Sequence, residues 1–290
     1  MAALPKFIAP GLAAAAVAGF LVPAGPATAS QLVGVDASNV KLAADGSGRA
    51  LVSFASGGSV HRVLASGAVN ARAPSKTVPQ VQFTLDTRGG DVRNTCTPVS
   101  LPLAWLVTAC KATDGSYWAL QSWQRLLPNG GARPAPAQAV RELRLSHWRG
   151  PAATLTIHLG WAYRRYVQLY GLFDYGGPVF GYHVRSGVPL DGYGRNIYVD
   201  ALDSDLGAGW RRVNSFLAHA PVGAFCYGFY PHGGRLGVGR LLRATAIGPG
   251  VTPDVMWQGA PPAKYDAAAD QAADGDLRSL LKGDRLCRAI

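Results

Sequence analysis

Glutamate is almost absent from this sequence. Of its 290 residues only 16% are charged, and the 17 acidic residues include a single glutamate, Glu142. A glycosidase of the usual two-carboxylate type would therefore have to use two aspartates, or one aspartate together with Glu142. The chain is nevertheless 48% hydrophobic. That share supplies a sizeable core and excludes wholesale disorder.

Motifs that identify common hydrolases and metal proteins are also absent. The sequence contains neither a Gly-x-Ser-x-Gly elbow nor a His-Glu-x-x-His motif. Its four cysteines lack the two-residue spacing of zinc knuckles. Asp200, Asp203 and Asp205 do not follow the ligand pattern of an EF-hand, and no repeat of fixed period indicates a solenoid. We therefore expect no metal and no cofactor, and no segment resembles a family of known activity.

Glycine and proline are plentiful, with 36 and 20 residues, and they favour many turns over long helices. Four apolar residues alternate with polar or small ones and predict a half-buried strand: Leu155, Ile157, Leu159 and Trp161. Further strands are expected at residues 165–172, 179–184, 196–200, 224–230 and 235–245. Short strands at regular spacing predict a mainly β fold, a sandwich- or barrel-like single domain with a short helical C-terminal tail.

Three segments in the first half of the sequence have local patterns of their own. Residues 51–54 and 60–64 flank Ser56-Gly57-Gly58-Ser59, which predicts a β-hairpin. Residues 117–123, Tyr-Trp-Ala-Leu-Gln-Ser-Trp, fit a strand and a short helix equally well. A further strand is expected to place three apolar side chains on one face: Val81, Phe83 and Leu85.

The mature chain is expected to form one β-rich domain over residues 30–262. Within it a small N-terminal β unit, residues 31–87, packs on the main body, residues 91–260. Residues 263–290 follow two prolines as a partly helical tail tethered by a disulfide.

The tail itself predicts two short helical pieces. Residues 264–273 are rich in Ala and Asp and permit a short exposed helix. Asp274 or Asp276 then caps a following turn that ends at Gly283. The apolar residues of that turn are Leu277, Leu280 and Leu281.

The first 29 residues have the pattern of a secretory signal peptide. Lys6 supplies a positive charge, residues 12–22 supply an apolar stretch, and Ala27-Thr28-Ala29 is the small-x-small pattern read by signal peptidase. The longer apolar run of residues 7–22 contains Pro10 and is still shorter than the roughly 20 residues that span a bilayer. We expect cleavage before Ser30, with no transmembrane span afterwards, and a secreted, extracellular protein.

Four cysteines follow the predicted cut, and an even number outside the cell usually means disulfides. Pro98 and Pro102 lie in the loop between Cys96 and Cys110, so we expect this pair to close a compact loop. The second predicted pair, Cys226 with Cys287, would join the tail to the body.

Arginines and aromatic rings are interleaved at several places, an arrangement that suits stacking on sugar rings beside anionic groups. The formal net charge is +11, which attracts polyanions. For an exported chain these are anionic polymers or glycans of the cell envelope, with no nucleic acid expected. The candidate ligand-binding residues are Trp148, Arg149, Tyr163, Arg164, Arg195, Asn196, Trp210, Arg211 and Arg212. Arg165 can share a face with Arg164 only where the chain bends.

The leading hypothesis is therefore a secreted, disulfide-stapled, β-rich protein that binds an anionic or glycan envelope surface without catalysis. The alternative is a secreted hydrolase, in which His219 or His232 works with an aspartate of residues 200–205. Its candidate catalytic residues are His219, His232, Asp200 and Ser215. Cysteine chemistry would require Cys226 to be free.

Overall fold

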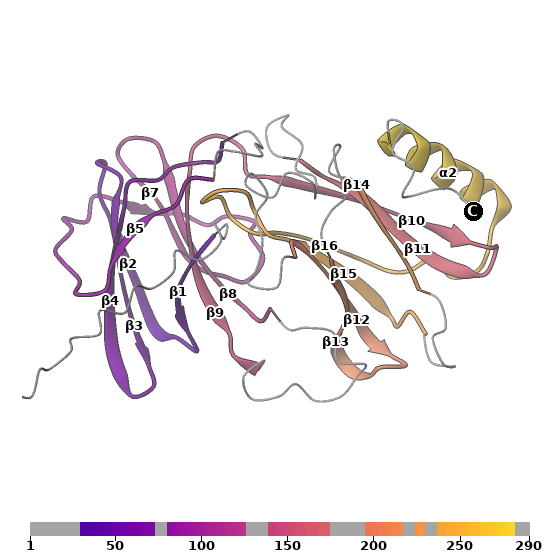
Figure 1. Ribbon diagram of the computed structural model, residues 1–290, viewed down its shortest axis with the longest axis horizontal. Helices are drawn as coiled ribbons and strands as arrows, with labels where there is room; N and C mark the ends of the chain where they lie inside the picture. The colour runs from indigo at the N-terminus through magenta and orange to yellow at the C-terminus, as the bar shows by residue number, and fades with distance from the viewer. Residues whose placement is uncertain are drawn as a thin grey trace, which may run out of the picture.

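The computed structural model describes residues 30–72, 80–125, 139–174, 195–216, 224–229 and 237–281. These residues form strands β1 to β16 and the helix α2, and the strands make four open antiparallel sheets. The mainly β, sandwich-like fold predicted from the sequence is confirmed. Two pairs of sheets lie side by side along the long axis of the molecule (Figure 1). The predicted leader and the predicted strand at residues 179–184 lie outside the described residues.

The first pair of sheets encloses the larger N-terminal core. One sheet has the order β1 (Gln31–Val35), β9 (Glu142–Trp148), β8 (Tyr117–Trp123), β7 (Leu106–Lys111) and β6 (Thr97–Pro98). The other has the order β2 (Ser38–Ala44), β3 (Arg49–Ser56), β4 (Ser59–Ser66) and β5 (Thr84–Asp86). Side chains from both sheets form one buried cluster that includes Phe54, Val63, Phe83, Trp118 and Leu145. Val81 and Leu85 pack against the same core, but the strand predicted to carry them is β5 alone, Thr84–Asp86, and residues 81–83 reach the core without strand pairing.

Two local features of this half explain how the sequence folds. Strands β3 and β4 form the predicted hairpin, in which Ser56 pairs with Ser59. Gly57 and Gly58 both have positive φ, 57° and 79°, the backbone that a two-residue hairpin turn needs and glycine adopts without strain. Residues 117–123 are strand β8, which pairs with β7 and β9 and is buried on both faces. Burial on both faces removes the alternation that would have told a strand from a helix.

The second pair of sheets encloses a separate C-terminal core. One sheet has the order β10 (Thr154–Ala162), β11 (Tyr166–Asp174) and β14 (Ala224–Gly228). The other has the order β13 (Gly207–Phe216), β12 (Ile197–Ser204), β15 (Leu241–Ala246) and β16 (Val255–Gly259). Their shared core includes Leu169, Val199, Phe225 and Leu242. Strand β10 is the predicted alternating strand, and three of its alternating side chains pack on this core: Leu155, Ile157 and Leu159.

The prediction for the tail was wrong in two respects. A single helix, α2 (Ala267–Leu281), runs through the positions where two short pieces were expected. Its first turn is capped by Asp266, whose carboxylate accepts a hydrogen bond of 2.8 Å from the backbone N–H of Ala269. The helix is also not simply exposed, because Ala273 and Leu277 are buried against Tyr170 of β11, and the helix lies beside β10 and β11 (Figure 1). This packing outweighs the poor helix propensity of Gly275.

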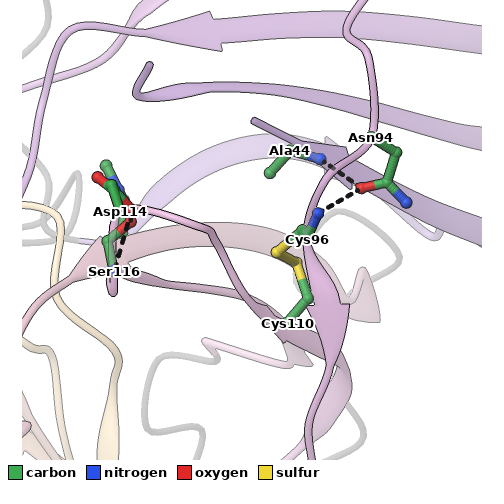
Figure 2. Close-up of a disulfide and its surroundings, with 7 residues drawn as sticks. Ala44, Asn94, Cys96, Cys110, Asp114 and Ser116 are labelled. Atoms are coloured by element: carbon green, nitrogen blue, oxygen red, sulfur yellow. Dashed lines mark hydrogen bonds between the residues drawn. A yellow bond between two sulfur atoms is a disulfide. The ribbon is translucent and has the colours of Figure 1, made fainter. Parts of the chain in front are cut away.

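One predicted disulfide is confirmed. Cys96 and Cys110 are bonded, with their Cα atoms 5.5 Å apart. The side-chain oxygen of Asn94 accepts hydrogen bonds from the backbone N–H groups of Ala44 and Cys96, which ties this loop to β2 (Figure 2). Cys226 is also disulfide-bonded, which removes the hypothesis of a nucleophilic thiol at this position. Its predicted partner, Cys287, lies outside the described residues.

Candidate functional site

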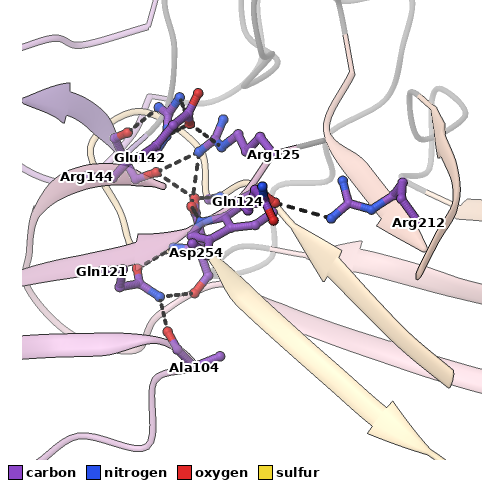
Figure 3. A network of polar contacts seen from close by, with 11 residues as sticks. Ala104, Gln121, Gln124, Arg125, Glu142, Arg144, Arg212 and Asp254 are labelled. Atoms are coloured by element: carbon purple, nitrogen blue, oxygen red, sulfur yellow. Dashed lines mark hydrogen bonds and ion pairs between the residues drawn. The ribbon is translucent and has the colours of Figure 1, made fainter. Parts of the chain in front are cut away.

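The two pairs of sheets are joined by a buried polar network centred on Asp254, which has no exposed surface (Figure 3). Its carboxylate accepts hydrogen bonds from the Trp123 ring N–H at 2.7 Å, from the Ser30 hydroxyl at 2.6 Å and from Arg125 at 3.1 Å. Its backbone N–H donates to the side-chain oxygen of Gln121 at 3.0 Å. Trp123 and Gln121 belong to the first half, and Asp254 directly precedes β16 of the second, so the network fixes one half against the other.

The single glutamate of the chain belongs to the same network. Glu142 pairs with Arg125 at 3.1 Å and with Arg144 at 2.6 Å, and both arginine side chains are almost fully buried. Burial, together with the positive charge of Arg125, lowers the pKa of Arg144 to about 10, so Arg144 stays charged at neutral pH. With two guanidinium groups on its carboxylate, Glu142 stabilises the junction and is not available as a general acid.

Beside this network lies a pocket of about 220 Å³ that we call the Arg-Trp pocket. Residues from both halves of the molecule line it: Trp105, Trp123, Gln124, Arg141, Asp200, Trp210, Arg212 and Arg243. Three guanidinium groups and one carboxylate leave the lining with a net charge of +2. Tryptophan rings and arginines thus converge on one small cavity, as the sequence hypothesis requires of a binding site.

Strand register brings the charged groups of the pocket together. On β12, Asp200 lies directly opposite Arg212 of β13 and Arg243 of β15. Directly opposed residues of antiparallel strands point to the same face of the sheet, so one carboxylate meets two guanidinium groups. Arg243 donates to Asp200 through Nε at 3.0 Å and through a terminal nitrogen at 2.7 Å, and the Nε of Arg212 donates to the other oxygen. Asp200 is only 3% exposed, so the triad is rigid and largely desolvated.

Aromatic rings pack against the guanidinium groups of Arg212 and Arg243. The Arg243 guanidinium carbon lies 4.2 Å from the ring centroid of Trp210 and 5.2 Å from that of Trp105. Trp105 in turn stacks on Trp123 with ring centroids 5.2 Å apart. Arg212 lies over Tyr198 at 4.7 Å. Cation–π contacts of this kind fix a guanidinium without using all of its N–H donors.

Arg141 differs from the other two arginines because it is exposed. A terminal nitrogen of its guanidinium donates to the backbone carbonyl of Ser122 at 3.0 Å, and its backbone N–H donates to the carboxylate of Asp36 at 2.8 Å. The side chain therefore lies at the rim of the pocket, held by a neutral carbonyl. This geometry leaves a positive charge at the entrance where an anionic group can approach.

Of the predicted ligand-binding residues, the pocket brings together Trp210 and Arg212. Arg211 lies between them on β13 and points to the opposite face of the sheet. Asn196 is buried beside the start of β12, next to Arg195. These last three residues do not line the pocket.

The remaining predicted ligand-binding residues lie elsewhere. Tyr163 and Arg164 form the turn between β10 and β11, both at positive φ, and Tyr163 is 61% exposed. The chain bends at this turn. A bend here is the condition under which the side chains of Arg164 and Arg165 can lie on one face. Trp148 is 3% exposed and stacks on Tyr117, so it presents no ring face to solvent. Arg149 forms an ion pair with Asp114.

The candidate catalytic residues of the hydrolase hypothesis are not seen together. His219 and His232 lie outside the described residues. Asp200 is held by two arginines, as described above. The hydroxyl of Ser215 is buried and has no hydrogen-bond partner within the part of the chain that the structure describes. Among the described residues no group of three or more His, Cys, Asp or Glu side chains has the arrangement of a metal site.

Five pocket residues were not among the predicted site residues: Trp105, Trp123, Gln124, Arg141 and Arg243. Trp123 stands in the segment of residues 117–123, whose periodicity is ambiguous, and Arg243 stands in a predicted strand without a neighbouring ring. Their partners lie on strands far away in the chain. Only the register of β12 with β15, and the contact of Arg243 of one half with the Trp105 ring of the other, bring them to one place.

A second polar cluster surrounds His147, a residue of β9 that is 3% exposed. Its ring nitrogens contact the carbonyl of Ala68 at 2.5 Å and the hydroxyl of Ser116 at 2.9 Å, and this hydroxyl donates to Asp114 at 2.6 Å. Trp118 stacks on the imidazole with centroids 3.7 Å apart. Serine, histidine and aspartate thus meet, but the serine has no exposed surface and its proton is engaged by the aspartate. The arrangement is that of a histidine enclosed in the core, with no serine hydroxyl open to a substrate.

This cluster predicts acid sensitivity. Burial lowers the pKa of His147 below its usual 6.5, so the folded state keeps the ring neutral while the unfolded chain takes up a proton. The free energy of unfolding should therefore fall as the pH drops below about 6.5. Burial raises the pKa of Asp114, but hydrogen bonds from Ser116 and Arg149 outweigh it and hold the pKa at about 2. The stabilisation by Asp114 should be lost below about pH 4.

Urea midpoints measured from pH 7.5 to pH 3 test this prediction. His147→Gln should flatten the dependence between pH 7 and 5, whereas the control His61→Gln, which changes an exposed residue of β4, should leave it unchanged. A wild-type stability that is constant from pH 7.5 to 5 would contradict the prediction.

Comparison with known proteins identifies no relative. No protein-family model, no curated protein and no solved structure matches this chain. Among the described residues, no helix has the length and apolar character needed to cross a bilayer. Any inference about function therefore depends on the chemistry of the Arg-Trp pocket.

Proposed function

We propose that this protein is an exported, non-catalytic binding protein that holds an anionic sugar unit of a cell-envelope polymer in the Arg-Trp pocket. The observation that supports it is the convergence of three arginines and three tryptophans on one cavity at the junction of the two halves. Arginine binds carboxylate and phosphate through paired N–H donors, and tryptophan rings stack on the apolar faces of sugars.

The size of the pocket limits what can enter it. Pockets for drug-sized ligands usually have volumes of roughly 300–1,000 Å³, and the Arg-Trp pocket has about 220 Å³. One sugar ring with its anionic substituent is the largest unit that this volume supports. A polymer would therefore bind through a chain end or a side group, with the rest of it outside. The net charge of +11 attracts such a polymer to the surface.

The carboxylates beside the pocket favour binding over hydrolysis. Two-carboxylate hydrolysis needs one acid that can give up a proton and one base that can take it. Asp200 and Glu142 are each engaged by two arginines, so both carboxylates already serve as partners of cationic side chains. The alternative hydrolase, built on His219 or His232, has no support from a contact among the described residues.

Export is part of the proposal and has its own support. The first 29 residues have the three parts of a secretory leader. Cys96 and Cys110 are disulfide-bonded, and such bonds persist in oxidising compartments.

The proposal predicts salt-sensitive binding that depends on Arg141. Wild-type protein should bind an immobilised polyuronate at low salt and be released by added salt, since screening weakens exposed charge pairs. Arg141→Gln should weaken binding by about tenfold, the loss expected for one charge-assisted hydrogen bond. The matched control Arg62→Gln removes the same charge from a half-exposed arginine of β4, which pairs with Asp91 and does not line the pocket.

Three matrices identify the anionic group in the same assay: a polyuronate, a sugar-phosphate polymer and a neutral glycan. Binding to either acidic matrix but not to the neutral one supports the proposal, and the preferred matrix names the group. A wild-type protein that binds none of them in low salt would contradict the proposal. Equal losses from Arg141→Gln and Arg62→Gln would assign the binding to general surface charge and contradict the role of the pocket.

A further inference from the structure

Ser30 is buried and makes several hydrogen bonds to the rest of the molecule. Its hydroxyl donates to Asp254 at 2.6 Å and accepts from Arg125 at 3.3 Å, and its backbone carbonyl accepts from Arg144 at 2.7 Å. Ser30 has no exposed surface. These partners come from the end of β8, from β9 and from the segment before β16, so Ser30 contacts both halves of the molecule.

The same residue directly follows the Ala27-Thr28-Ala29 pattern, which is the small-x-small signal for leader removal. The sequence identifies where a peptidase would cut, and the structure shows that the residue directly after this cut is buried and hydrogen-bonded to both halves of the molecule. We infer that Ser30 is the first residue of the mature chain and that this new terminus is a positioning residue for the Arg-Trp pocket.

The connection to the pocket runs through two direct contacts. Ser30 and the ring N–H of Trp123 bind different oxygens of the same carboxylate, Asp254. Trp123 lines the pocket and stacks on Trp105, which also lines it. Without Ser30, the Oδ1 atom of Asp254 loses its hydrogen bond of 2.6 Å and keeps only the longer one of 3.2 Å from the backbone N–H of Gly248. One donor of Arg144 loses the Ser30 carbonyl in the same buried place. The carboxylate of Asp254 would then shift towards its remaining partners, and the ring of Trp123 with it.

The test has one measurement on the exported protein and one on defined chains. Cleavage before Ser30 depends on the proposed export. We therefore expect Ser30 as the first residue when the intact mass and N-terminal sequence are measured on protein released by its producing cell. For the second measurement, disulfide-bonded chains beginning at Ser30 and at Gln31 are compared with Ser30→Ala. The matched control is Ser38→Ala, whose hydroxyl makes an exposed hydrogen bond to the carbonyl of Ala55.

The chain beginning at Gln31 should melt roughly 5 °C or more below the chain beginning at Ser30. It should also bind the polyuronate at least about threefold more weakly at a temperature where both are folded, a change that lost stability alone would not cause. Ser30→Ala should show part of both effects and Ser38→Ala neither.

Different failures remain distinguishable. A mature terminus downstream of Ser30, or equal melting of the two chains, would overturn the inference. A lower melting temperature with unchanged polyuronate binding would overturn the link to the pocket. If no chain binds any acidic matrix, the proposed function is wrong. The position of the mature N-terminus and the difference in melting temperature still decide whether Ser30 is the first residue and stabilises the buried network.

Discussion

Replacing Asp200 by asparagine should lower the free energy of unfolding by about 3–5 kcal/mol, the usual cost of removing one partner from a buried ion pair. The carboxylate lies between Arg212 and Arg243, whose side chains are 4% and 16% exposed. Asparagine keeps the shape but not the charge, so two guanidinium groups would remain close together with no anion between them. Their repulsion in a place shielded from water accounts for the size of the effect.

The control is Asp203→Asn on the same strand. Asp203 also pairs with an arginine, Arg240, but both side chains are largely exposed. Exposed pairs contribute about 0–1 kcal/mol, so this variant should unfold at nearly the wild-type urea concentration. Asparagine also tolerates the positive φ of 51° at this position. Equal losses in the two variants would show that the buried triad does not stabilise the protein as described.

Asp254→Asn should lower the free energy of unfolding by a similar amount, about 3–5 kcal/mol, for a different reason. Its carboxylate balances Arg125, which is 2% exposed, and accepts hydrogen bonds from Trp123 and Ser30. The amide group of asparagine carries no charge and can accept through only one of its two atoms. Because the network joins the two halves, calorimetry should show the variant melting earlier and with separation of the halves into two transitions.

Asp91→Asn is the control for this variant, because Asp91 is fully exposed and pairs with Arg62 on the surface. Its melting curve should match the wild type. A single, unshifted transition for Asp254→Asn would contradict the role of the network as the connection between the halves.

Features set by short-range chemistry could be predicted from the sequence. The hairpin of β3 and β4 follows from Gly57 and Gly58, because positive φ at two successive positions is favourable only for such residues. The loop closed by Cys96 and Cys110 spans 14 residues and needed no knowledge of the rest of the fold. The alternation on β10 was readable because its core-facing residues repeat with period two.

Features set by long-range packing could not be predicted. Helix α2 continues through Gly275 because Leu277 and Ala273 pack on Tyr170, more than 100 residues earlier in the chain. In the pocket, Trp210 and Arg212 were found because they stand together in the sequence. Arg243 was missed because only the register of β15 against β12 brings it to Asp200.

Nuclear magnetic resonance of the tryptophan indole N–H groups tests the central claim most directly. During titration with an acidic oligosaccharide, the resonances of Trp105 and Trp210 should shift and saturate, because their rings line the Arg-Trp pocket. Trp148, which is buried in another cluster, should not respond. Shifts confined to Trp161, which lies next to the Tyr163 turn, or no shift in any indole while the ligand binds, would contradict the assignment of binding to this pocket.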